Sequence, residues 1–191
     1  IQSSCEALLR IINDILDYSK IDAGKLSIEH ANFDLYRLID ECALLFALHA
    51  KERGLPIKTE ILPDVPRWMV GDSTRIRQII INLLGNAYKF TEHGAVTLRV
   101  YLRKDNGKDG VLVQFEVQDT GIGISASDLN RVFEKGYTGI NGRSDKTASG
   151  LGLYLCKNIL DMLNHKITIE SSVGKGTRVI LDLTHFEGRI E

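Results

Sequence analysis

A stripe of polar side chains follows one face of a predicted helix that begins near Asp72 and runs to Thr91. Its members recur at i, i+4, i+8 and i+11, and they are Gln78, Asn82, Asn86 and Lys89. Asparagine is a mediocre helix former, so two of them one turn apart suggest a function. An amide oxygen can ligate Mg²⁺, and a lysine one turn further can neutralise phosphate. Taken alone, the stripe can equally be a solvated helix face.

Three glycine-containing segments follow this helix along the chain. Asp119-Thr120-Gly121-Ile122-Gly123 comes after a predicted strand, and its alternating glycines let the backbone approach a flat ligand. A buried carboxylate there can accept a hydrogen bond from the exocyclic amine of adenine. Gly150-Leu151-Gly152-Leu153 leads directly into a helix, whose exposed amides and positive dipole end suit a phosphate. Gly174-Lys175-Gly176-Thr177 is typical of a tight hairpin, and each segment alone is weak evidence.

These segments exclude two common nucleotide motifs. No glycine is followed by Lys and then Ser or Thr, so a Walker P-loop is absent. The segment that begins at Asp119 also lacks the third glycine of a dinucleotide fingerprint.

The hydrophobic pattern predicts the elements that must position these residues. Helices are expected over 1–23, 33–53, 72–91, 126–134 and 151–163. Strands are expected over 26–32, 56–62, 95–103, 111–118, 167–171 and 177–183. The predicted fold class is an α/β two-layer sandwich, with a mixed, mostly antiparallel sheet covered by helices and preceded by one long N-terminal helix. We expect residues 1–25 to form a separate helical segment whose apolar stripe needs a partner helix, from elsewhere in the chain or from a second copy, and 26–191 to form one domain with a mobile loop over about 134–149.

Composition narrows the function classes. The net charge of -1 and a pI near 6.6 give no general attraction to nucleic acid or to an anionic membrane. Cys5, Cys42 and Cys156 lie far apart, which argues against a disulfide framework or a zinc site and favours a reducing, cytoplasmic setting. No apolar run approaches the roughly 20 residues that span a bilayer. The sequence does not begin with Met, and we expect a fragment of a longer chain.

The order of the motifs resembles the ATP-binding domain of sensor histidine kinases. Asn82 to Thr91 is similar to their N box, and the three glycine segments are similar to their G1, G2 and G3 boxes. Val132-Phe133-Glu134 resembles the F box that precedes the ATP lid, and Tyr18 to Lys25 resembles the end of the second dimerisation helix. The resemblance covers essentially the whole chain. It implies the Bergerat fold that is shared with gyrase, the mismatch-repair ATPase MutL and heat-shock chaperones.

The resemblance also implies cofactors and residue roles. ATP and Mg²⁺ are the expected cofactors, with Asn82, Asn86 and Lys89 catalytic, Asn86 holding the metal and Asp119 reading adenine. The expected ATP-binding residues are Asn86, Lys89, Phe90, Asp119, Gly121, Gly123, Ile124, Phe133, Tyr137, Lys146, Ser149, Gly150, Leu151, Gly152, Leu153 and Thr177.

One position distinguishes kinases from ATPases within this superfamily. The ATPase relatives carry a water-activating glutamate where this chain has Asn82. An amide cannot act as a general base near neutral pH, so phosphoryl transfer to a separate nucleophile is favoured over hydrolysis.

The phospho-acceptor of the family has no counterpart here. Its histidine lies in a His-Glu-Leu/Ile-x-x-Pro setting, which none of the five histidines has: His30, His49, His93, His165 and His185. We therefore expect no autophosphorylation by this chain alone and transfer to a histidine outside it. The implied partners are a histidine-bearing dimerisation domain, the receiver domain of a response regulator and a second copy in a full-length homodimer. The location implied is the cytoplasmic part of a membrane-anchored sensor.

Two alternatives stay open from the sequence. One is a degenerate-kinase regulatory module that acts by heterodimerisation through residues 1–23. The other is a Bergerat-fold ATPase, which Asn82 disfavours.

Overall fold

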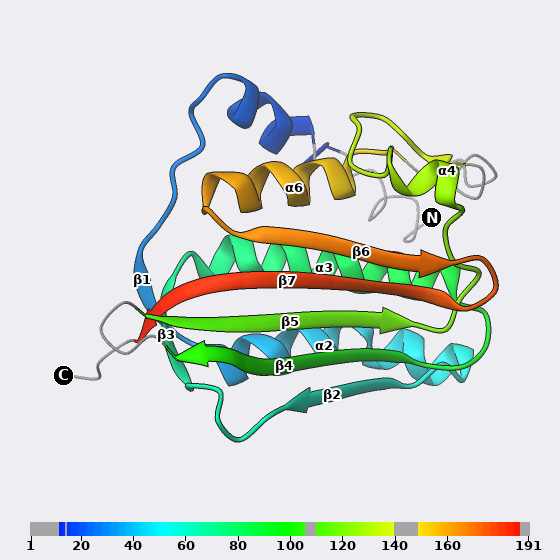
Figure 1. The fold of residues 1–191 in the computed structure, drawn as a ribbon, viewed down its shortest axis with the longest axis horizontal. Coiled ribbons are helices and arrows are strands. Elements are labelled where there is room, and N and C mark those ends of the chain that lie inside the picture. Colours follow the sequence, from blue (N-terminus) through cyan, green and yellow to red (C-terminus); the bar gives the residue numbers. More distant parts are fainter. Residues whose placement is uncertain (1–11, 14, 106–109, 140–148, 188–191) are drawn as a thin grey trace.

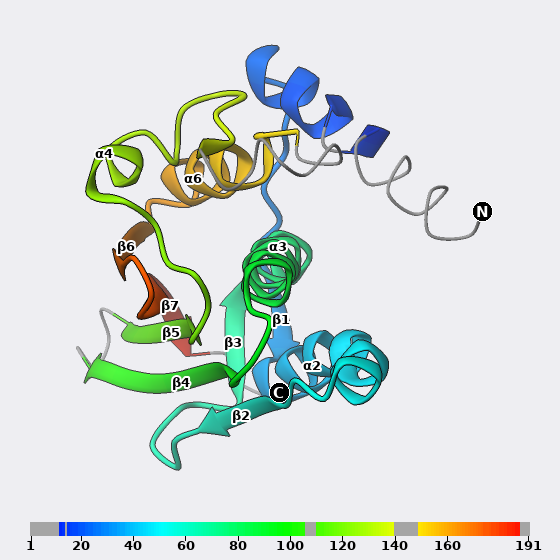
Figure 2. The ribbon, with the colours of Figure 1, turned by 90° about the vertical axis from the view of Figure 1, so that its right-hand side faces the viewer.

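The computed structural model describes residues 12–13, 15–105, 110–139 and 149–187. Among them is a seven-stranded sheet that carries its helices on one face, as the side view shows (Figure 1, Figure 2). The predicted α/β two-layer sandwich is confirmed.

Three long antiparallel strands form the centre of the sheet. They are β4 (Val96–Asp105), β5 (Val111–Asp119) and β7 (Gly176–Glu187). The flanking strands are β6 (Lys166–Ser172), antiparallel to β7, and β2 (Ile57–Ile61), parallel to β4. At the far end of β7 the sheet continues into β3 (Trp68–Gly71) and β1 (Ala31–Asp34). The mixed, mostly antiparallel arrangement therefore agrees with the prediction.

Local signals at their ends explain where the helices begin and stop. The main helices are α2 (Leu35–Arg53), α3 (Ser73–Phe90) and α6 (Gly152–Met162). Asp34 and Asp72 are N-caps whose carboxylates accept from the third amide of their helices, as the sequence predicts for Asp72. Gly54 ends α2 in the left-handed region at φ 61°.

The core lies between the sheet and the helices. Alternate residues of β4 (Val96, Leu98 and Val100) are wholly buried, as the period of two along a strand requires. They face an apolar stripe of α3 that includes Ile76, Ile79, Ile80 and Leu83. Each such side chain contributes roughly 1.5–3 kcal/mol relative to an exposed one, so α3 is held firmly against the sheet.

The opposite face of the sheet is polar and is crossed by a chain of ion pairs. Glu60 on β2 contacts Arg99 on β4 at 2.7 Å, and Arg99 lies 3.7 Å from Glu116 on β5. Arg178 on β7 then contacts Glu116 at 2.6 Å and Glu170 on β6 at 3.0 Å. This ladder, from Glu60 to Glu170, ties five strands together without any covering helix.

Three sequence predictions of elements are wrong in detail. Residues 25–30 form no strand, and the strand begins only with β1 at Ala31; the Glu29 amide donates to the capping Asp72 carboxylate at 3.0 Å. Strand β3 was not predicted, since four residues are too short to show an alternating pattern. The helix expected over 126–134 is only α4 (Ala126–Leu129), after which Arg131 and Glu134 donate to carbonyls three residues back, as in turns.

The helix expected at the N-terminus is present in its described part. Residues 12–13 and 15–22 are helical, and Gly24 ends the helix with φ 63° and a bond from the Lys25 amide to the Lys20 carbonyl at 2.8 Å. This segment lies beside α6 in both ribbon views (Figure 1, Figure 2). Residues 1–11 lie outside the described part, so the predicted domain boundary near residue 25 stays a prediction.

Contacts from its last turns bind this helix to the sandwich. The Asp17 carboxylate accepts from Arg75 at 3.2 Å and from Gln78 at 2.7 Å, both on α3. The Tyr18 ring lies 6.1 Å from that of Tyr154 on α6, and its hydroxyl accepts from Lys135 at 2.5 Å. Within the described segments, no helix has both the length and the apolar character needed to cross a membrane.

Candidate functional site

A pocket of about 460 Å³ opens where α3, the ends of β5 and β7 and the start of α6 meet. Its size is in the range of ligand sites in proteins. Thirteen predicted site residues line it: Asn82, Asn86, Lys89, Phe90, Asp119, Gly123, Ile124, Tyr137, Ser149, Gly150, Gly152, Leu153 and Thr177. They come from five separate segments, so the fold brings together residues that are up to 95 positions apart, from Asn82 to Thr177.

Four predicted site residues are not among the pocket lining. Gly121 lies behind the pocket wall, Phe133 packs against the hydrophobic core, and Leu151 is the residue before α6. Lys146 lies outside the described residues.

The polar side chains along α3 do not all face the pocket. Asn82, Asn86 and Lys89 face the pocket, whereas Gln78 is engaged by Asp17 of the N-terminal helix. The start of α6 comes close to this stripe, since a Cβ on Gly152 would stand 3.4 Å from the Asn82 side-chain oxygen. Asn82 therefore lies beside the N-terminus of α6, and Asn86, one turn further along α3, lines the same pocket.

Asp119 is a buried carboxylate at the end of β5, 8% exposed. Its Oδ1 accepts from the Gly121 amide at 2.8 Å and from the Thr177 amide at 3.2 Å. Burial raises the pKa of Asp119, while these backbone bonds and the Thr91 hydroxyl act in the opposite direction. With Oδ1 occupied, Oδ2 is the oxygen that can accept from a ligand.

The backbone around Asp119 is packed too tightly for side chains. A Cβ on Gly121 would stand 2.2 Å from the Phe90 carbonyl oxygen. Gly123 has φ 71°, and a Cβ there would stand 2.1 Å from the Ser172 carbonyl oxygen. Glycine at these positions lets the G1 segment lie flat between α3 and the β6–β7 hairpin.

The two ends of the predicted lid meet at the edge of the pocket. The Gly136 amide donates to the Gly150 carbonyl at 3.1 Å, and the Tyr137 hydroxyl donates to Asp128 at 2.7 Å. Helix α6 then begins at Gly152 with no side-chain cap on its first turn. Its first amides are therefore available to an anion, an arrangement that suits a phosphate.

Sequence reasoning missed several lining residues. Phe46 of α2, Asp128 of α4, Ile169 of β6 and Val179 of β7 also line the pocket. Their positions depend on how distant elements pack, and no local motif marks them.

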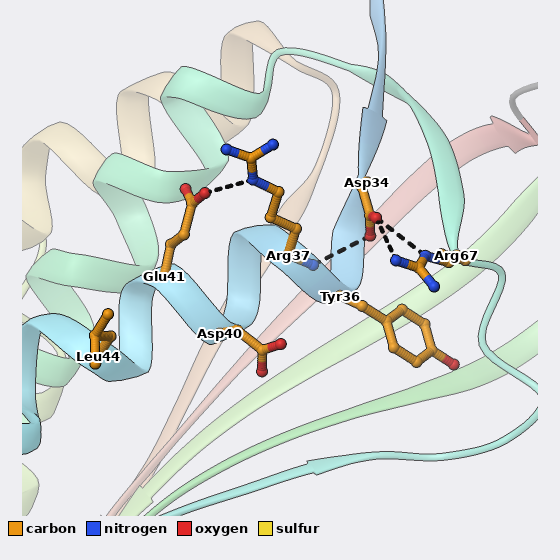
Figure 3. Close-up of a pocket in the computed structure, with 7 residues that line it drawn as sticks. All are labelled: Asp34, Tyr36, Arg37, Asp40, Glu41, Leu44 and Arg67. Carbon is orange, nitrogen blue, oxygen red and sulfur yellow. Dashed lines mark hydrogen bonds and ion pairs between the residues drawn. The ribbon is translucent and has the colours of Figure 1, made fainter.

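A second hollow lies at the start of α2 and has no comparable chemistry (Figure 3). Four of its charged groups form two ion pairs: Arg67 contacts Asp34 at 2.9 Å, and Arg37 contacts Glu41 at 2.7 Å. Elsewhere in the described part of the chain, no group of three or more His, Cys, Asp or Glu side chains could hold a metal ion.

Comparison with known proteins agrees with this geometry. Residues 71–186 match the model of the family described as histidine kinase-, DNA gyrase B-, and HSP90-like ATPase. The chain belongs to this family. The family match spans all four motifs and the pocket from Asn82 to Thr177, and the resemblance to histidine kinase ATP-binding domains is confirmed.

Curated relatives of this ATPase-family chain are sensor kinases. It is 38% identical over 178 residues to "Hybrid signal transduction histidine kinase B" of Dictyostelium discoideum, covering 93% of this chain and 9% of that protein. It is 35% identical over 184 residues to "Sensor histidine kinase GacS" of Pseudomonas protegens, covering 96% of this chain and 20% of that protein. The chain spans between 9% and 24% of the length of the first curated relatives it matches.

Solved structures of histidine kinases share the fold of this domain. Full-length ShkA in complex with AMPPNP superposes with a TM-score of 0.81 at 27% identity, covering 98% of this chain and 38% of that one. The catalytic domain of histidine kinase ThkA gives a TM-score of 0.67 at 26% identity, covering 83% of this chain and 97% of that one.

Proposed function

We propose that this chain is the ATP-binding catalytic portion of a two-component sensor histidine kinase. It would transfer the γ-phosphoryl group of ATP to a histidine that this chain does not contain. The single observation that carries the proposal is the convergence of Asn82, Asn86, Lys89 and Asp119 on one pocket beside the uncapped start of α6.

Each part of a bound ATP has a chemically matched group in this pocket. Asp119 Oδ2 would accept from the adenine amine, because the two backbone donors occupy Oδ1. Phosphates would lie near Lys89 and the first amides of α6, where positive charge and open N–H groups coincide. Tyr137, Ser149 and Gly150 line the same pocket at the ends of the lid.

The pocket also suits magnesium that arrives with the nucleotide. Mg²⁺ keeps few protein ligands and takes the rest from phosphates and water, which fits one or two amide oxygens rather than a carboxylate cage. Asn86 would supply that oxygen, with Asn82 one turn away. The metal would neutralise charge that develops on the phosphates.

The residues favour transfer over hydrolysis. In the transfer, a histidine nitrogen attacks the γ-phosphorus, the bond from that phosphorus to the β–γ bridging oxygen breaks, and ADP leaves. Asn82 faces the pocket where a water-activating carboxylate would be needed for hydrolysis, and an amide cannot take the proton from water. The proposed partners are accordingly a histidine-bearing dimerisation domain, a second copy of the full-length protein and a receiver domain, in the cytoplasm.

Titration calorimetry of the chain with ADP, in the presence and absence of Mg²⁺, tests the binding step. We expect binding that strengthens with Mg²⁺ and an Asn86→Ala variant that loses this Mg²⁺ dependence. Asn130→Ala is the matched control, since Asn130 is exposed and lies outside the pocket.

Incubation with radiolabelled ATP then separates the possible activities. Label on an added histidine-bearing dimerisation domain, with none on this chain alone, supports the kinase. Phosphate release without an acceptor would indicate an ATPase, and the absence of nucleotide binding would favour a regulatory module. Phosphohistidine on the isolated chain would contradict the expected lack of autophosphorylation.

A further inference from the structure

Thr91 is a wholly buried residue at the C-terminal end of α3. Its backbone is fixed on both sides: its carbonyl accepts from Arg53 at 3.1 Å, and the preceding Phe90 carbonyl accepts from Ile122 at 3.1 Å. The main chain at Thr91 is therefore held in place, and burial leaves its side chain little room.

The Thr91 hydroxyl has no hydrogen bond of normal geometry. Among the described residues it is the one buried side-chain oxygen or nitrogen for which no partner is found. Buried hydroxyl groups are nearly always hydrogen-bonded, because leaving one unpaired is costly. A buried hydroxyl that lies behind a ligand pocket and lacks a bond of normal geometry suggests a bond that tightens when the ligand binds.

The group nearest to that role is the Asp119 carboxylate. A weak hydrogen bond from the Thr91 hydroxyl, outside normal geometry, lowers the pKa of Asp119 against the larger effect of burial, which raises it. Thr91 also stands directly behind the turn that follows Asp119, since a Cβ on Gly121 would come within 2.8 Å of its oxygen. The backbone donors to Asp119 both use Oδ1, so Oδ2 lacks a backbone donor among the bonds described.

We propose that Thr91 is a positioning residue for base recognition. When a nucleotide binds, the Thr91 hydroxyl donates to the Asp119 carboxylate. This bond fixes the orientation in which Asp119 Oδ2 accepts from the exocyclic amine of adenine. Thr91 does not line the pocket and touches no ligand, so it acts only through Asp119. This inference rests on the proposed ATP-binding function.

Base selectivity separates this role from a purely structural one. Adenine carries an amine at position 6, whereas hypoxanthine carries an oxygen there and cannot donate to Asp119 from that position. A general weakening of the fold would reduce the affinities for ADP and IDP by the same factor. Loss of a residue that orients Asp119 reduces the affinity for ADP alone.

The test is calorimetric titration of the parent chain and its variants with ADP and with IDP. Thr91→Val keeps the shape and removes the hydroxyl, and we expect ADP binding about five- to tenfold weaker with IDP binding unchanged. Thr91→Ser restores a hydroxyl and is expected to restore the parent preference for ADP. Thr97→Val, on the outer face of β4, is the matched control and is expected to bind like the parent.

Different outcomes would refute the role of Thr91 and the proposed nucleotide binding. A parent chain that prefers ADP, with a Thr91→Val variant that binds ADP equally well or loses ADP and IDP equally, refutes this inference alone. A parent chain that binds neither nucleotide refutes the proposed function, and this inference with it. If the valine variant fails to fold, Thr91→Ala and Thr91→Ser give the same comparison.

Discussion

Substitution of Gly85 by alanine should stabilise the ligand-free chain and weaken nucleotide binding at the same time. Gly85 lies inside α3, between the two pocket asparagines, and apart from its chain neighbours and its own helix backbone no atom lies within 4 Å of the place a Cβ would occupy. Glycine inside a helix costs roughly 0.8–1.0 kcal/mol relative to alanine. With no steric contact to oppose it, Gly85→Ala should raise the free energy of unfolding by about 1 kcal/mol.

That gain converts into a measurable shift of the thermal midpoint. For a chain of this length, a change of about 1 kcal/mol moves the midpoint by roughly 2–4 °C. Because Gly85 lines the pocket, the new methyl group takes up ligand space, and ADP binding should weaken as stability rises. Urea unfolding followed by circular dichroism measures the first effect, and calorimetry measures the second.

Gly123→Ala is the contrasting variant. Its left-handed φ of 71° costs alanine about 1–2 kcal/mol, and its Cβ would meet the Ser172 carbonyl oxygen at 2.1 Å. We therefore expect clear destabilisation from the same chemical change. A Gly85→Ala variant that unfolds more easily than the parent would refute the reasoning, because it would mean that the space beside Gly85 is filled.

Three further predictions concern charged residues. Asp119→Asn should weaken ADP binding yet leave the ligand-free chain as stable or more stable. Burial raises the Asp119 pKa, so the stability supplied by the protonated carboxyl is present in acid and is lost as pH rises. The thermal midpoint of Asp119→Asn relative to the parent should therefore increase from about pH 4 to about pH 7. Arg178→Met should lower the free energy of unfolding by about 2–4 kcal/mol, measured by urea denaturation. It would leave the Glu116 side chain, which is 4% exposed, with the more distant Arg99, at 3.7 Å, to pair with its charge. Glu116→Gln should lower the free energy of unfolding by only about 1 kcal/mol, because the Arg178 side chain is 38% exposed and keeps its ion pair with Glu170. If the two variants lost equal stability, this account would be wrong. Asp17→Ala should speed amide hydrogen exchange in residues 15–22 but not in the middle of α3, because it removes the bonds to Arg75 and Gln78.

Local signals account for the parts of the fold that the sequence predicts well. Helix α3 carries a capping aspartate, an apolar stripe and a polar stripe, all of which are set by residues within a few positions of each other. Strands β4, β5 and β7 are long enough to show alternation. The four-residue β3 is not, and of the strand expected over 26–32 only residues 31 and 32 lie in β1, while the Glu29 amide bonds to the distant Asp72 side chain.

The site was predictable as a set of motifs but not as a geometry. That Thr177 donates to Asp119 follows from the pairing of β5 with β7, a contact between positions that no short-range pattern connects. Phe46 enters the pocket because α2 packs beside α3, with its ring stacked 5.3 Å from Tyr88. The sequence marks Thr91 only as the last residue of the N box, because a buried hydroxyl without a normal partner can be recognised only in three dimensions.

The bonds from Asp17 to Arg75 and Gln78 have a mechanical consequence. They hold the first turns of α3, the helix whose later turns carry Asn82 and Asn86. From Arg75 to Asn86 is eleven residues of unbroken helix, about 16 Å at 1.5 Å per residue. The N-terminal helix is therefore joined to the pocket asparagines by one continuous helix, so that removing the Asp17 bonds would loosen the start of the element that carries them.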